Sequence, residues 1–139
     1  MKKLSLAVGL LAMALSLTAC KSRSIVGKWT SDTSLVPGVS TTIDFKADKT
    51  AAFNMKGNVQ GIDMNANFKA NYDLQGEKLS VTMTEVDLGS IAMMLPPGTV
   101  DTIKSEMGNR NTGTLQWNDD NKITIVTADG QSTVYSRAK

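Results

Sequence analysis

The chain has 139 residues, with 15 Lys and Arg against 13 Asp and Glu. Lys2 and Lys3 lie in a segment typical of an export signal, so the rest of the chain holds 13 residues of each sign. This balance argues against nucleic-acid binding, which needs a basic surface. The chain has no histidine, the commonest general base and metal ligand. We therefore expect no enzymatic activity, no cofactor and no bound metal.

Residues 1–20 have the layout of an export signal. A basic start is followed by apolar residues 4–17, and Leu17-Thr18-Ala19-Cys20 ends the segment. The apolar stretch of 14 residues is short for a bilayer-spanning helix. The final four residues resemble the lipobox of bacterial lipoproteins. The alternative is an ordinary signal peptide followed by a free cysteine.

The lipobox resemblance implies a division of the chain. Residues 1–19 are removed, Cys20 is lipidated, residues 20–24 form a short tether, and residues 25–139 form the domain. Acyl chains on Cys20 anchor the protein to a membrane. In Gram-negative members of that family a residue other than Asp after the cysteine implies the outer membrane, with the domain in the periplasm; here it is Lys21. Lys21 and Arg23 either contact anionic lipid or are ordinary solvated charges.

The domain is predicted to consist of strands joined by turns. Over residues 62–74 apolar and polar side chains alternate, the period of a half-buried strand. Seven shorter runs cover residues 25–31, 39–46, 50–56, 78–86, 111–117, 122–127 and 131–137. We predict an all-β fold, an eight-stranded antiparallel up-and-down barrel, because closure leaves no free edge. A membrane-spanning barrel alternates too, but most of these runs have only six to nine residues.

Both ends of the strand pattern resemble a known family. Gly27-Lys28-Trp29 is similar to the Gly-x-Trp of lipocalins, and Arg137 stands where that family places an Arg against the Trp. With the lipobox, the layout resembles small bacterial lipocalin-like (calycin-type) lipoproteins. The last strand also looks like that of fatty-acid-binding proteins, which carry an Arg two residues before the final Tyr. Here that position is Thr133.

The predicted topology gives the barrel two different ends. Connections after the second, fourth and sixth runs are short and lie at the end where the first strand starts. The long connection, residues 87–110, lies at the other end, so an open mouth would point away from the membrane. It contains an apolar run and a short helix with Thr99 as N-cap. This insert is either a lid or a plug that completes the core. Its lid or partner-contact residues are Met93, Met94, Leu95, Ile103 and Met107.

Two functions follow from this layout. The first is binding of a small apolar or amphiphilic ligand inside the barrel, with Ala66, Ala70 and Gly113 leaving room for it. The lining predicted for that ligand is Phe45, Phe53, Met64, Phe68, Tyr72, Val81, Met83 and Tyr135. The alternative is a filled barrel that binds an envelope protein through its distal loops, as an inhibitor or assembly accessory.

Overall fold

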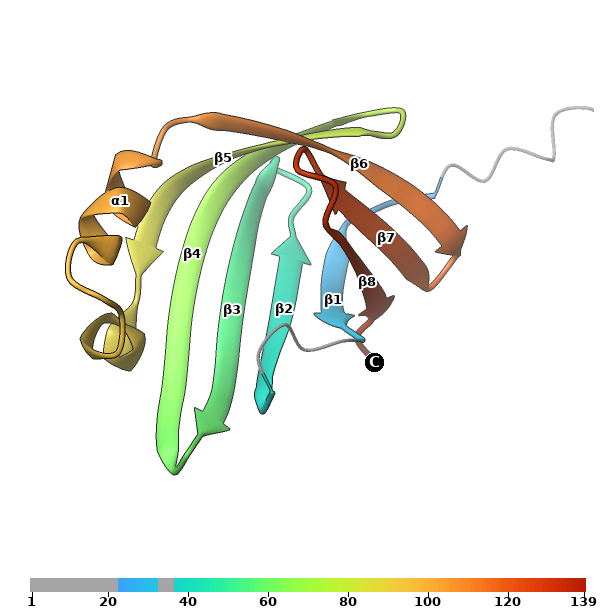
Figure 1. Ribbon diagram of the computed structural model, residues 1–139. Coiled ribbons are helices and arrows are strands. Elements are labelled where there is room, and N and C mark those ends of the chain that lie inside the picture. The colour runs from blue at the N-terminus through green and yellow to red at the C-terminus, as the bar shows by residue number, and fades with distance from the viewer. Residues whose placement is uncertain (1–22, 33–36) are drawn as a thin grey trace, which may run out of the picture.

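The structure is a computed structural model that describes residues 23–32 and 37–139. The predictions for the signal segment, for Cys20 and for Lys21 lie outside these residues. Eight antiparallel strands follow chain order around a closed barrel (Figure 1). They are β1 (Gly27–Ser31), β2 (Val39–Phe45), β3 (Thr50–Val59), β4 (Ile62–Gln75), β5 (Lys78–Asp87), β6 (Arg110–Asp119), β7 (Lys122–Thr127) and β8 (Ser132–Arg137). The predicted lipocalin-like up-and-down barrel is confirmed.

The direction of the alternation is clearest on β4, the longest strand. Its inward residues Ala66, Ala70 and Tyr72 are buried, while the intervening Asn65, Asn67, Lys69 and Asn71 are exposed. Four strands, β3 to β6, have ten residues or more, so the sequence-based argument from short strands is wrong. The polar outer face of β4 is instead what differs from a membrane-spanning barrel, whose outer face is apolar.

The barrel is packed with large side chains at the end where β1 begins. Trp29, Leu115 and Ile123 are fully buried, and Phe45 is nearly so. The Trp29 indole Nε1 donates a hydrogen bond to the Ile25 carbonyl oxygen at 2.8 Å, which satisfies its one polar atom. This end of the barrel is therefore a close-packed core.

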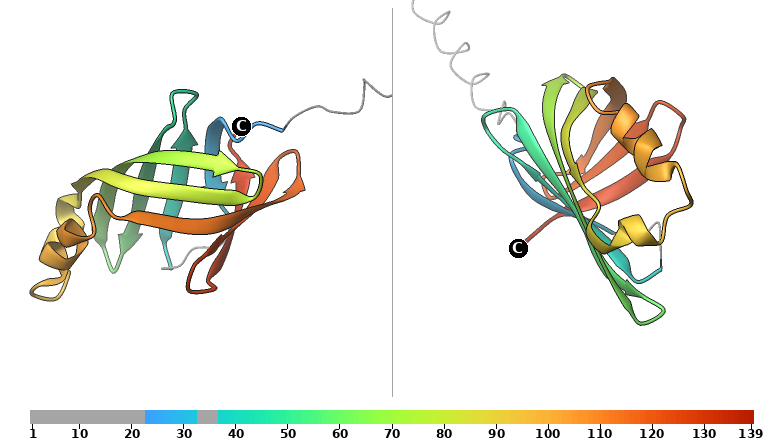
Figure 2. Two further views of the ribbon diagram at one scale, coloured as in Figure 1. Left: turned by 90° about the horizontal axis from the view of Figure 1, so that it is seen from above. Right: turned by 90° about the vertical axis from the view of Figure 1, so that its left-hand side faces the viewer.

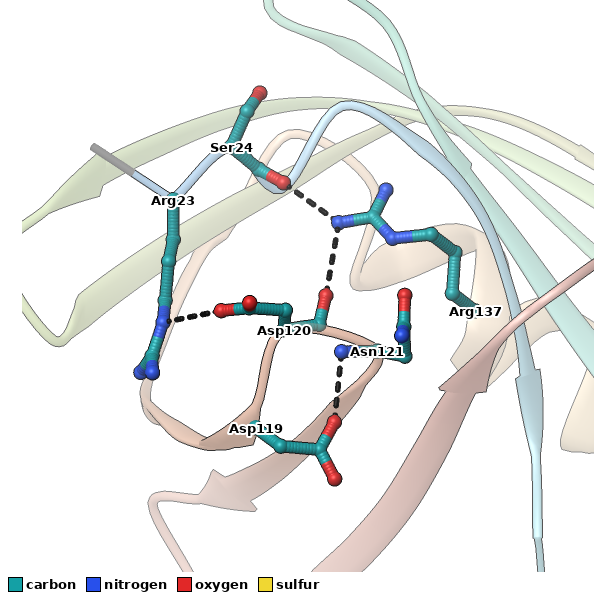
Figure 3. Close-up of polar contacts among 6 residues, drawn as sticks. All are labelled: Arg23, Ser24, Asp119, Asp120, Asn121 and Arg137. Atoms are coloured by element: carbon teal, nitrogen blue, oxygen red, sulfur yellow. Dashed lines mark hydrogen bonds and ion pairs between the residues drawn. The ribbon is translucent and has the colours of Figure 1, made fainter. Parts of the chain in front are cut away.

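Arg137 joins the first and last strands at this end. It is the β8 partner of Trp29 in β1, and its guanidinium carbon lies 4.2 Å from the centre of the Trp29 ring. Its Nη2 donates to the Ser24 carbonyl at 3.0 Å (Figure 3). Its Nη1 donates to the Val26 carbonyl at 3.1 Å. A Cβ on Gly27 would lie 3.0 Å from this guanidinium, on a backbone with φ of +129°. The Gly-x-Trp pattern thus has a physical cause in the space that Arg137 occupies.

The same contacts continue to the start of the described chain. The Trp117 and Trp29 rings pack edge-on, with their centres 5.9 Å apart. The guanidinium carbon of Arg23 lies 5.7 Å from the centre of the Trp117 ring. Arg23 also pairs with Asp120 at 2.9 Å, in the β6–β7 turn (Figure 3). The Arg23 side chain keeps 47% of its surface exposed in this pair, and its contact with lipid stays a prediction. Arg23 is folded onto the closed end of the barrel.

The long insert covers a free strand edge. β4 pairs with β5 only from Asn67 onwards, which leaves the start of β4 without a partner on that side. The 3₁₀ helix η1 (Gly89–Met93) packs there: the Ser90 hydroxyl donates to the Asp63 carbonyl at 2.8 Å. Gly89 approaches β4 so closely that a Cβ would lie 2.5 Å from the Asn65 carbonyl oxygen. A short helix thus replaces the missing end of β5 and protects the edge.

The second helix of the insert, α1 (Thr99–Ser105), differs from the prediction at its start. Thr99 is the first helical residue, and Gly98, with φ of 87°, is the N-cap. The Pro-Pro-Gly turn supplies the left-handed conformation, so no side chain caps the helix. Asp101 lies in the first turn, as predicted. Within the described residues no helix is both long and apolar enough to cross a membrane.

We predict that Trp29→Phe lowers the free energy of unfolding by about 2–4 kcal/mol, because it removes buried volume and leaves the Ile25 carbonyl unpaired. Trp117→Phe is the matched control, since Trp117 is only half-buried, and we expect a loss of about 1 kcal/mol. Urea unfolding followed by circular dichroism measures both. Equal losses would contradict a central role for Trp29.

Candidate ligand cavity

The other half of the barrel is hollow. It holds a cavity of about 650 Å³, within the size range of small-molecule binding sites. Its wall is mostly apolar and comes from β2, β3, β4, β5, β6, β7 and β8. The apolar lining residues are Ile43, Phe45, Phe53, Met55, Phe68, Leu79, Val81, Met83, Ile125, Ala128 and Tyr135, with Gly113 beside them. The barrel is thus neither wholly filled nor wholly empty.

The cavity opens at the end opposite the Trp29 core. Ala128, Asp129 and Gln131 of the β7–β8 turn line it, as do Asn111 and Thr112 at the start of β6. These segments lie at the far end of an up-and-down barrel from the start of β1. Figures 1 and 2 show the helical insert at that far side and residues 23–26 at the opposite side. The mouth therefore lies at the end of the barrel opposite residues 23–26, as the topology predicted.

The cavity brings together most of the ligand-contact residues predicted from the sequence. Phe45, Phe53, Phe68, Val81, Met83 and Tyr135 line it. Tyr72 and Met64 do not. The Tyr72 ring packs edge-on against Phe45 at 4.9 Å, and its hydroxyl donates to the Lys46 carbonyl at 2.7 Å. Tyr72 therefore belongs to the packed end of the barrel.

Met64 lies outside the cavity because of its height along the barrel. It pairs with Gly57 near the β3–β4 turn, beyond the level of the lining residues Met55 and Phe68. Ala66 and Ala70 are buried but do not line the cavity, whereas Gly113 does. The predicted spare room is therefore found at Gly113 and not at the two alanines.

Sequence reasoning missed several lining residues. Ile43, Met55, Leu79 and Ile125 lie on the inward positions of their strands. The same alternation that identified Phe53 and Val81 contained the signal for them. The polar residues at the mouth carried no such signal, because turn residues are polar in most proteins.

None of the five predicted lid residues lines the cavity. Met93 and Met94 are exposed, and Leu95, Ile103 and Met107 are half-buried. The insert is fixed at both sides, by η1 on β4 and by the Gly108 amide, which donates to the Met83 carbonyl at 3.0 Å. In this structure the insert is an edge cover beside the cavity and not a closed lid.

Two ionisable side chains line the cavity. Burial raises the pKa of the Tyr135 hydroxyl above its ordinary value of 10.0, so this group stays neutral and offers one donor and one acceptor. At the mouth, Asp129 accepts a hydrogen bond from the Thr127 hydroxyl. That bond, together with a hydrogen bond from the Gln131 backbone amide, holds the pKa of Asp129 below its ordinary value. The cavity is thus apolar with a neutral hydroxyl inside and a carboxylate at its entrance.

Comparisons with known proteins define little beyond this geometry. No protein-family model matches the chain, and no curated protein matches it either. A crystal structure of an uncharacterized protein from Bacteroides eggerthii DSM 20697 is similar to it, with a TM-score of 0.49 and 16% sequence identity. The similarity covers 83% of this chain and 100% of that chain.

We predict that both tyrosines are less than half ionised at pH 10.0, because the pKa values of Tyr72 and Tyr135 are raised in the folded chain. The unfolded chain then loses these protons first, so stability is full below that pH and falls as the pH rises above it. Ultraviolet absorbance of tyrosinate measures the titration, and Tyr135→Phe assigns one of the two steps. Half-ionisation of Tyr135 at or below pH 10.0 would contradict its buried position.

Proposed function

We propose that this protein is a lipid-anchored component of the cell envelope that binds a small apolar or amphiphilic molecule in its barrel. The observation that carries the proposal is the apolar cavity of about 650 Å³ beside a fully packed barrel end. The packed end makes a stable closed barrel, so the hollow is not needed for the fold. An apolar hollow with a few polar groups at its mouth is the usual form of a small-molecule site.

The anchoring part of the proposal is supported by the sequence of residues 17–20 and by the position of Arg23. Only two residues separate Cys20 from Arg23, which is held on Trp117 and Asp120. Acyl chains on Cys20 would therefore hold the packed end at the lipid surface and direct the mouth into the aqueous space. A ligand would then enter from the periplasm, if the cell is Gram-negative and the anchor is in the outer membrane.

A second function, binding of an envelope protein through the distal loops, is favoured by one observation. Met93 has 87% of its surface exposed, and Met94 beside it and Ile62 at the start of β4 are exposed as well. The Ser90 hydroxyl donates to the Asp63 carbonyl, so the segments that carry these three residues adjoin; we call Ile62, Met93 and Met94 the apolar rim. Exposed apolar groups of this kind mark contact sites for other macromolecules.

Native mass spectrometry tests the ligand-binding proposal. The chain expressed with its own N-terminus and carrying Cys20→Ser is exported and purified without detergent. We expect a reproducible bound molecule, reduced about tenfold by Phe68→Gln or Met83→Gln, because either change places an unpaired amide in the apolar wall. Met93→Gln is the control and keeps the ligand, since Met93 is exposed.

The opposite result is equally clear. A protein that is free of ligand and takes up neither decanol nor phospholipid would reject the ligand-binding proposal. The exposed rim of Ile62, Met93 and Met94 would then be the site to test, by cross-linking to envelope proteins.

The anchor has its own test. We predict that the wild-type chain incorporates a radioactive fatty acid and sediments with membranes, whereas Cys20→Ser does neither, because the cysteine is the only thiol in the sequence. Ser24→Cys in the Cys20→Ser chain is the matched control, since it restores a thiol outside the lipobox. Membrane association of the Cys20→Ser chain would refute lipidation as the anchor.

A further inference from the structure

The charge that lines the cavity is of one sign, negative. Among the described residues that line it there is no Lys or Arg, and Asp129 is the one charged side chain. Two arginines lie near lining residues in the sequence or in the sheet, but their guanidinium groups are bound to other groups. Arg110 precedes the lining residue Asn111 and donates to the Ser80 hydroxyl at 3.2 Å, and Arg137 is bound to carbonyl groups behind the Trp29 ring. Neither guanidinium lines the cavity.

From this arrangement, and resting on the proposed function, we infer that the cavity selects its ligand by charge: it takes amphiphiles with a cationic head most tightly, uncharged ones next, and carboxylate anions least. The alkyl chain occupies the apolar half-barrel, and the cationic head lies at the mouth beside the Asp129 carboxylate.

An anionic ligand is disfavoured in either orientation. With its head at the mouth, a carboxylate would lie beside Asp129, and two like charges at contact distance repel. With its head at the inner end, the carboxylate would meet the Tyr135 hydroxyl and the Trp29 core, where no cation lines the wall. A buried charge without a counter-charge is strongly unfavourable.

A cationic head is favoured at the mouth for two reasons. The Thr127 hydroxyl holds the Asp129 carboxylate in the ionised form and fixes its place in the β7–β8 turn. The neighbouring lining groups, the Gln131 and Asn111 side chains and the Thr127 hydroxyl, carry no charge that would oppose a cation. At an exposed site, Coulomb attraction of one such pair corresponds to roughly a fivefold gain in affinity, and repulsion to a similar loss.

Isothermal titration calorimetry with three probes of one chain length tests the inference. The Cys20→Ser chain is titrated with decylamine, decanol and decanoate near neutral pH, below the concentration at which the probes form micelles. We expect decylamine to bind at least about tenfold tighter than decanoate, with decanol between them. The preference shrinks in about 1 M salt, because the Debye length falls to about 3 Å.

Variants assign the preference to Asp129. Asp129→Asn is expected to reduce the difference between decylamine and decanoate to about threefold or less, with little change for decanol. Asp101→Asn, on the exposed surface of α1, removes the same charge away from the cavity and keeps the full difference. Tight binding of decanol by Asp129→Asn shows that the variant is folded.

The outcomes separate this inference from the proposed function. Binding of decanoate as tightly as decylamine, or an unchanged preference in Asp129→Asn, would overturn charge selection and leave ligand binding intact. Failure of all three probes to bind would overturn both.

Discussion

The fold depends on the contact between Trp29 and Arg137. A barrel closes only if its first and last strands pair, and here that seam is short: β1 and β8 share three residue pairs. Arg137 supports the seam by lying on the Trp29 ring and by donating to the Val26 and Ser24 carbonyls. Trp29 in turn is fully buried. The Arg137 guanidinium, the Trp29 indole and the core side chains around that indole therefore form one packed unit.

This seam also divides the molecule into two functional halves. Of the largest fully buried side chains, Trp29, Leu115 and Ile123 belong to the packed end, whereas Ile43 and Phe45 also line the cavity and so mark where the hollow part begins. Because Arg23 is held on Trp117 at the same end, the start of the described chain and the mouth of the cavity lie at opposite ends of the barrel. The closed end of the barrel, with Arg23 held on it, is thus built by one cluster of aromatic and arginine side chains, and the open end lies opposite.

Much of the fold was predictable because a period of two in the sequence directly encodes which face of a strand is apolar. What the period does not encode is local irregularity. At Lys69 and Ala70 the β4–β5 register shifts, since Glu85 and Met83 are their partners and Thr84 is left over. This bulge changes which residues of β5 face inward. The η1 helix was missed for a related reason: five residues are too few to show a helical period.

The candidate site was predicted in part, and its errors have a common cause. Alternation tells whether a side chain points inward but not how far along the barrel it lies. Phe68 and Tyr72 are both inward on β4, yet Phe68 lines the cavity and Tyr72 packs in the core. Height depends on the stagger between strands, which arises from pairing far apart in the sequence. Asp129, the one charged side chain among the described lining residues, was missed for a different reason, because turn residues are polar in most proteins.

The most direct test of the account is nuclear magnetic resonance of the methionine methyl groups during titration with decanol. Met55 and Met83 line the cavity, whereas Met93 and Met94 are exposed outside it. A ligand inside the half-barrel is predicted to shift the Met55 and Met83 signals and to leave those of Met93 and Met94 unchanged. Shifts confined to Met93 and Met94 would show that the apolar rim, and not the cavity, is the binding site.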